Sequence, residues 1–218
     1  MLPIITPSDA ACRKTDDSAF VVDFYWRSSP VLERILTGIK ENSCGLLRSL
    51  RFTWSRPKSA ATTEAVFVGH TLAAMLDAAH QLAGSPFSTL HIEKVAGKND
   101  LFALIDFANG VVAELELNEC LPLTMPDICF IKANFTNGHI TNQPLVGHFN
   151  EEGAILATDD SLQTMLCETG DFEPANGMIE QMQQRFRFLA GQGDAAPGDQ
   201  GAKEIISLID NAIAEKGR

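Results

Sequence analysis

Several features are missing from this chain of 218 residues, and each absence excludes a class of protein. No apolar run approaches the ~20 residues that a transmembrane helix needs, so we expect no membrane partner. Lysine and arginine number 17 against 28 acidic residues, which gives a net charge of -11. Because such a surface repels phosphate backbones, nucleic acid is excluded as a partner. The first residues lack the basic start and apolar core of a secretory signal, so we expect a cytoplasmic location.

Motifs for metal binding and disulfide chemistry are also absent. No two cysteines form a C-x-x-C pair, and no histidine cluster stands beside them at the spacing of zinc ligands. We therefore predict no metal site and expect reduced, mostly buried thiols. The five cysteines are Cys12, Cys44, Cys120, Cys129 and Cys167.

The composition is that of a globular domain, with 45% hydrophobic and 21% charged residues. The length fits one domain better than two. We predict a single α+β domain over residues 1–218. Within it we expect an N-terminal helical lead-in over 1–17, a sheet with two helices over 18–160, and C-terminal helices over 161–218.

Helix signals lie near both ends of the chain. Thr6, Pro7 and Asp9 occupy the N-cap, first-turn and capping-box positions of a helix start. Ser29 and Pro30 begin a second helix, whose apolar residues recur at the spacing of one buried face. Further helices are expected at about 64–83, ended by Gly84, at about 174–190, and from 201 onward.

Strand patterns fill the middle of the chain. The apolar run at 20–25 predicts one strand, and from residue 46 the apolar residues alternate with period two, which predicts another. Asn109-Gly110 and Asn137-Gly138 each separate two strand-like runs, and Asn-Gly favours the type I′ turn of a hairpin. Residues 101–107 are apolar on both faces. This pattern indicates that helices cover one side of the strand and that a partner, such as another subunit, covers the other.

Several sequence blocks occur in an order that resembles a known family. Together they are similar to the C-terminal α/β domain of the Gfo/Idh/MocA oxidoreductases, over roughly residues 18 to 218. The blocks are FVVDFYWRSSP at 20–30, GLLRSLRFTWSRPK at 45–58, Leu76-Asp77 with Leu82 and Gly84, FANGVV at 107–112, and GAKEI at 201–205.

The resemblance implies an α+β fold with an open, mostly antiparallel β-sheet and helices packed on one face, as in the C-terminal domain of glyceraldehyde-3-phosphate dehydrogenase. It also implies a homodimer formed through the other face of the sheet. Periodicity independently supports helices early and late in the chain with strands between them.

The resemblance also shows which chemistry these residues lack. The family binds its nicotinamide cofactor on an N-terminal Rossmann domain, whereas these 218 residues contain no complete G-x-G-x-x-G fingerprint. No cofactor is therefore expected, and NAD or NADP would enter only with a separate Rossmann-domain partner chain. The family's proton-donating lysine falls on Leu2, which cannot donate a proton.

A second family signature is an aspartate and a general-base histidine four residues apart on the helix that ends near Gly84. Counted back from Asp77 and Gly84, these positions fall on His70 and Ala74, so both roles are lost. In an alternative register, His70 is itself the base. We expect a domain that is inactive alone.

Two sets of residues could nevertheless carry chemistry. His70, Asp77 and His80 are spaced to share a helix face and could form an acid–base cluster, although a purely structural role is favoured. A basic stretch could bind the carboxylate or phosphate of a sugar acid, although pairing with nearby acidic residues is favoured. This stretch comprises Arg51, Trp54, Arg56 and Lys58.

Three functions are consistent with these patterns. The first is a non-catalytic domain that self-associates through its open sheet. The second is the substrate-binding subunit of a split sugar dehydrogenase, in which His70, Arg51 or Arg56 line a pocket completed by a Rossmann chain. The third is a module that binds a sugar or sugar acid without chemistry, for which the basic stretch is the evidence.

Overall fold

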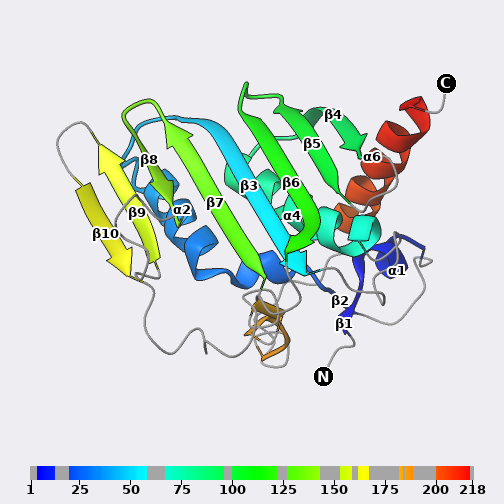
Figure 1. Cartoon of the computed structure of the whole chain (residues 1–218). Coiled ribbons are helices and arrows are strands. Elements are labelled where there is room, and N and C mark those ends of the chain that lie inside the picture. Colours follow the sequence, from blue (N-terminus) through cyan, green and yellow to red (C-terminus); the bar gives the residue numbers. More distant parts are fainter. Residues whose placement is uncertain are drawn as a thin grey trace.

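A computed structural model describes residues 4–12, 20–57, 67–95, 100–121, 127–142, 153–158, 162–166, 182–183, 185–188 and 200–216. Its largest feature is an eight-stranded sheet with the order β10-β9-β8-β7-β3-β6-β5-β4 (Figure 1). Neighbouring strands are antiparallel except for β3 and β6, which are parallel. The strands are β3 (Leu47–Pro57), β4 (Phe87–Lys94), β5 (Leu101–Phe107), β6 (Val112–Leu121), β7 (Ile128–Phe135), β8 (Gly138–Thr141), β9 (Gly153–Thr158) and β10 (Leu162–Leu166).

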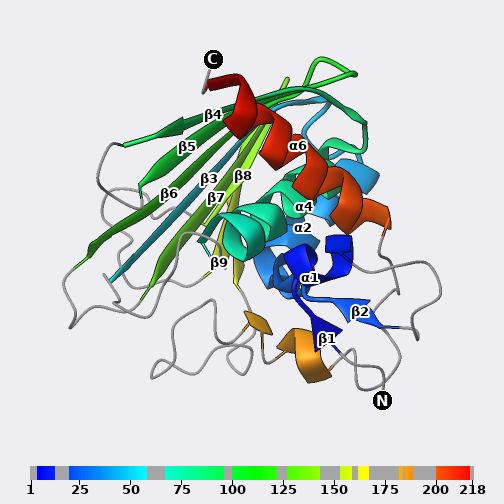
Figure 2. The same cartoon turned by 90° about the vertical axis from the view of Figure 1, so that its right-hand side faces the viewer.

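The helices form a second layer on one face of this sheet, as Figure 2 shows. The main ones are α2 (Pro30–Lys40), α4 (Ala73–Ala83) and α6 (Gln200–Lys216), and a π-helical turn, η2 (Phe67–Leu72), leads into α4. The N-terminal part contributes β1 (Ile4–Ile5), α1 (Pro7–Cys12), β2 (Val21–Val22) and the 3-10 turn η1 (Tyr25–Ser28). The predicted α+β class, with an open, mostly antiparallel sheet and helices on one face, is confirmed.

Local signals explain where the helices begin and end. The Ser29 side chain accepts a hydrogen bond from the Leu32 N–H at 3.4 Å, and Pro30 occupies the first turn of α2. The Thr6 hydroxyl likewise accepts from the Asp9 N–H at 3.2 Å at the start of α1. Helix α4 ends at Gly84, whose φ of 59° lies in the left-handed region that glycine adopts at little cost.

Strand β5 shows how the sheet separates a buried face from an exposed one. Its burial alternates along the whole strand, and Ile105 is fully buried against the helix layer. Phe102 and Leu104, on the opposite face, are 42% and 49% exposed. We call this opposite face the open face; among the described residues, no helix lies on it (Figure 2). That a partner covers the open face stays a prediction.

Both Asn-Gly hairpins are present, but the predicted type I′ turns are wrong. Neither Asn109 nor Asn137 has a positive φ. In the β5–β6 hairpin, the Gly110 N–H donates to the Phe107 carbonyl, and Gly110 then adopts a φ of 83°. A three-residue loop with glycine in the left-handed position suits this hairpin. In the second hairpin, Phe135 pairs with Gly138, so the glycine is already part of β8.

Two further predictions differ from the structure, and a third can be compared only in part. The apolar run at 20–25 forms only the two-residue strand β2, because its pairing partner β1 is equally short and the chain then turns into η1. Residues 162–166, expected in a helical region, form edge strand β10. Of the helix expected at 174–190, only 182–183 and 185–188 are described, and these are helical.

Candidate functional site

The residues predicted to form an acid–base cluster lie on η2 and α4, but each contacts a different partner. His70 Nε2 lies 3.1 Å from Asp23 Oδ2. Asp77 accepts two hydrogen bonds from Arg27 instead. The His80 ring stacks on Phe87, with the ring centroids 4.9 Å apart. The structure therefore does not bring His70, Asp77 and His80 together.

Asp77 and Arg27 form a bidentate ion pair between α4 and η1. Arg27 Nε and Nη2 donate to the two carboxylate oxygens at 2.8 and 2.6 Å. The Asp77 side chain is only 4% exposed, whereas that of Arg27 is 34% exposed. Gln81 adds a third hydrogen bond to Asp77 at 3.3 Å. Because its oxygens are already occupied, Asp77 has the contacts of a structural residue.

The position that corresponds to the expected catalytic histidine is apolar. Ala74 is fully buried in the core, so α4 offers no titratable group there. Leu2, at the expected lysine position, lies outside the described residues. The sequence allowed two registers for the family's general-base histidine. Only the alternative register places an imidazole, that of His70, at the position of the base.

Asp23, Tyr25 and His70 form a small polar cluster that is partly enclosed by the core. Asp23 is 6% exposed, and its Oδ1 has no hydrogen-bond partner among the described residues. The Tyr25 ring meets the His70 ring edge to face at 5.5 Å. Burial, and then the neighbouring Cys129, raise the pKa of the Tyr25 hydroxyl, so Tyr25 stays protonated. A carboxylate that orients an imidazole is an arrangement that can support proton transfer.

The basic stretch is divided between the two faces of β3. Arg51 lies on the open face and pairs with Glu114 at 2.9 Å. Trp54 is buried beneath the helix layer, and the Arg56 guanidinium lies 5.1 Å from the centroid of its ring. Arg56 also pairs with Glu119 through its Nε at 2.9 Å. Both arginines thus have acidic partners, in agreement with the favoured prediction that the basic stretch pairs with nearby acidic residues. Lys58 lies outside the described residues.

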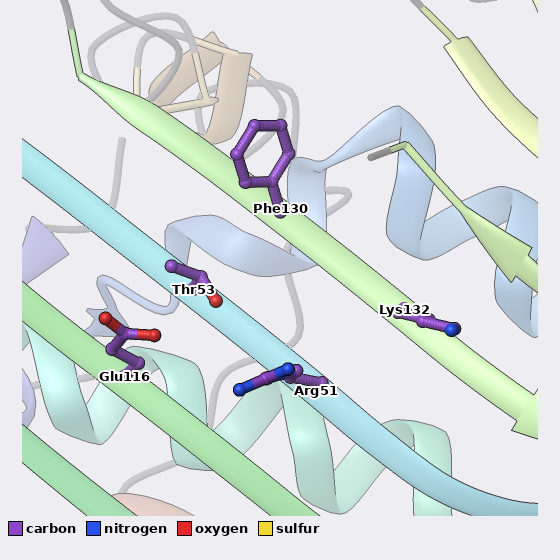
Figure 3. A pocket seen from close by; sticks show the side chains of 5 residues that line it. All are labelled: Arg51, Thr53, Glu116, Phe130 and Lys132. Carbon is purple, nitrogen blue, oxygen red and sulfur yellow. The ribbon is translucent and has the colours of Figure 1, made fainter. Parts of the chain in front are cut away.

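A shallow hollow of about 230 Å³ occupies the middle of the open face (Figure 3). It is lined by Arg51 and Thr53 from β3, Glu116 from β6, and Phe130 and Lys132 from β7. Sequence reasoning missed Phe130 and Lys132. Alternation along β7 could have placed both on one face, but the pairing of β7 with β3 depends on contacts far apart in the chain.

The four described cysteines carry no evident chemistry, and Cys167 lies outside the described residues. Burial raises the pKa values of the Cys44 and Cys129 thiols, which keeps them protonated and unreactive. Cys12 and Cys120 are exposed, contrary to the expectation of mostly buried thiols. Within the described ranges, no three His, Cys, Asp or Glu residues gather as a metal site would require. No helix of the described chain is long and apolar enough to span a bilayer.

Comparisons with known proteins match this chain by its fold and not by its sequence. No family model matches the sequence, and no curated protein matches it either. Many solved structures do match in three dimensions. One is an oxidoreductase from Agrobacterium radiobacter in complex with NAD+, L-tartaric acid and magnesium, with a TM-score of 0.69 and 15% identity. The match covers 100% of this chain and 72% of that one.

Two other neighbours extend the range of functions found with this fold. A levoglucosan dehydrogenase in complex with NADH has a TM-score of 0.62 and 20% identity, with 91% of this chain and 64% of that chain covered. A super-repressor mutant of Gal80p from Saccharomyces cerevisiae has a TM-score of 0.64 and 11% identity, with coverage of 90% and 62%. The chain therefore spans about two thirds of the length of these neighbours. At such identities the likeness shows the fold alone.

Proposed function

This chain has the fold of the C-terminal domain of Gfo/Idh/MocA-type oxidoreductases, and we propose that the domain is non-catalytic by itself and self-associates through its open face as a homodimer. The observation that carries this proposal is the pair of large apolar side chains, Phe102 and Leu104, exposed on the open face. Exposed apolar groups gathered beside charged ones are typical of protein–protein contacts. A cytoplasmic location is part of the same proposal.

The contacts around α4 support the non-catalytic part of the proposal. Asp77 is held in an ion pair by Arg27, and Ala74 has no group that could take up a proton. The 218 residues also carry no dinucleotide fingerprint, so we expect neither NAD nor NADP to bind to them. One structural neighbour, the Gal80p variant, is described as a super-repressor and not as an oxidoreductase. The fold by itself therefore does not imply catalysis.

Two measurements on one purified sample test the proposal. Sedimentation equilibrium is expected to give twice the chain mass of 23.7 kDa. Calorimetric titration with NADH and with NADPH is expected to give no binding heat. A monomer at every concentration would contradict the self-association, and clear micromolar binding of either nucleotide would contradict the non-catalytic assignment.

A second function is favoured by the contact between Asp23 and His70. An imidazole oriented by a buried carboxylate could act as the base in a split, NAD(P)-dependent sugar dehydrogenase, with a separate Rossmann chain as its partner. A sugar or sugar acid would then be the ligand. In this case dehydrogenase activity appears only when the two chains are mixed.

The His70→Gln variant tests this second function, because glutamine keeps a hydrogen-bonding side chain but cannot take up a proton. We expect mixed-chain activity to fall by about 10²-fold or more, the usual contribution of a general base. His80→Gln is the matched control, since His80 stacks on Phe87 and has no carboxylate partner in the described structure. Equal activity in both variants would remove His70 from the mechanism.

A further inference from the structure

The hollow on the open face has two chemically different ends, and these lie in successive rows of paired residues across the sheet. In one row, Arg51 of β3 lies beside Lys132 of β7. In the other row, Thr53 lies between Glu116 of β6 and Phe130 of β7. The two rows are two residues apart along the strands, a separation of about 6.6 Å. One end of the hollow is therefore cationic, and the other combines a carboxylate, a hydroxyl group and an aromatic ring (Figure 3).

The cationic end has positive charge to offer to a ligand. Among the described residues, Lys132 has no acidic partner. Burial, and then the positive charge of Lys132, lower the pKa of His139 on β8, so this charge acts across the neighbouring strand. Arg51 pairs with Glu114, but the two side chains are 55% and 42% exposed, and such pairs are weak. The pair engages one of the five N–H groups of the guanidinium and leaves others for a ligand.

The opposite end can accept a hydrogen bond and hold a flat ring. Glu116 accepts one hydrogen bond on Oε1, from Asn118 Nδ2 at 3.2 Å, so its second oxygen can accept from a ligand. The Thr53 hydroxyl lies beside it on β3 and can donate or accept. Phe130 provides an aromatic wall, against which another ring packs in a stacked or edge-to-face geometry. A negatively charged group at this end would be repelled by the carboxylate of Glu116.

We infer that the hollow binds a small, flat hydroxy acid, whose carboxylate pairs with Arg51 and Lys132 and whose hydroxyl group donates to Glu116. The simplest example is 4-hydroxybenzoate, which carries the two groups at opposite ends of one benzene ring, a span similar to the separation of the two rows. Its ring packs against Phe130. Pockets for drug-sized ligands measure about 300–1,000 Å³, so a hollow of about 230 Å³ suits a single ring. Every group involved belongs to one copy, so the inference is independent of the proposed self-association.

Two acids of the same shape distinguish this arrangement from a general attraction for anions. Terephthalate has a second carboxylate where 4-hydroxybenzoate has its hydroxyl group, and that carboxylate would face Glu116. We expect the wild-type chain to bind 4-hydroxybenzoate about tenfold more tightly than terephthalate. In Glu116→Gln the amide can donate to the second carboxylate, so terephthalate is expected to bind at least as tightly as 4-hydroxybenzoate. A surface that only attracted anions would prefer the doubly charged terephthalate in both proteins.

Variants of the lining side chains test the individual contacts without disturbing the core. Lys132→Met removes the charge and keeps an apolar side chain of similar length, so 4-hydroxybenzoate is expected to bind about tenfold more weakly. Phe130→Leu removes the aromatic wall and is expected to weaken binding about threefold. Lys40→Met is the matched control, because Lys40 is exposed on α2 in the helix layer and its loss should leave the affinity unchanged. An NMR titration that follows the backbone amides gives the affinity and locates the bound acid.

The outcomes separate this inference from the function proposed above. Saturable binding at millimolar concentrations or below, with amide shifts centred on β3, β6 and β7, supports the inference. It is overturned by no binding in that range, by shifts elsewhere, by an affinity that Lys132→Met leaves unchanged, or by a wild-type preference for terephthalate. Sedimentation of the same samples reports self-association separately. A monomer that binds the acid contradicts only the homodimer, and a dimer that does not bind it contradicts only this inference.

Discussion

The variant Ile105→Asp is expected to unfold the protein, whereas Leu104→Asp, one residue earlier on the same strand, is expected to keep the fold and lose self-association. Ile105 is fully buried among the core residues beneath the helices. A carboxylate there loses the burial of an isoleucine and adds an uncompensated charge, a cost of about 4 kcal/mol or more. Domains are stable by only about 5–15 kcal/mol. Leu104 is half exposed, so its replacement costs the monomer about 1 kcal/mol or less.

Urea unfolding and sedimentation on the same two variants measure these effects. Ile105→Val and Leu104→Ser are the controls, since they change each site without adding a charge. We expect Ile105→Val to remain folded and Leu104→Ser to weaken the dimer less than Leu104→Asp does. If Leu104→Asp unfolded the chain as fully as Ile105→Asp, β5 would be covered on both faces within one copy, and the open face would not exist.

The sequence predicted the parts of the fold that depend on local patterns. The alternation along β3 and the capping residue Ser29 each act over a few neighbours, and both are present as expected. The parallel pairing of β3 with β6 could not be predicted, because those strands are separated by the whole of α4 and β5. The run at 20–25 was misread because its aromatic residues suit a strand as well as a buried 3-10 turn.

The candidate site was less predictable because, like the pairing of β3 with β6, it depends on contacts between residues far apart in the chain. The helical spacing of His70 and Asp77 suggested that they act together. In the fold, their partners are Asp23, which directly follows β2, and Arg27 in η1, and these lie 47 and 50 residues earlier in the chain. No periodicity links residues at such separations. The hollow on the open face is similar, since three strands contribute to it and only their register brings Arg51 beside Lys132.

The Arg27–Asp77 pair decides whether Asp77 is structural or available for chemistry. Arg27→Met removes the cation and leaves a buried carboxylate without its main partner. Breaking a buried pair costs about 3–5 kcal/mol, and because Arg27 is one-third exposed we expect about 2–4 kcal/mol. The double variant Arg27→Met with Asp77→Leu is expected to regain most of this loss, because it also removes the stranded charge.

Chemical denaturation of the two single variants and the double variant gives the coupling energy between the residues. Arg51→Met is the control, since the side chains of Arg51 and its partner Glu114 are 55% and 42% exposed and this pair should contribute little stability. A strong coupling means that the carboxylate of Asp77 is committed to holding η1 against α4, and the helix then has no acidic group left for catalysis. If Arg27→Met were neutral, Asp77 would be only loosely held, and a catalytic role for its carboxylate would regain support.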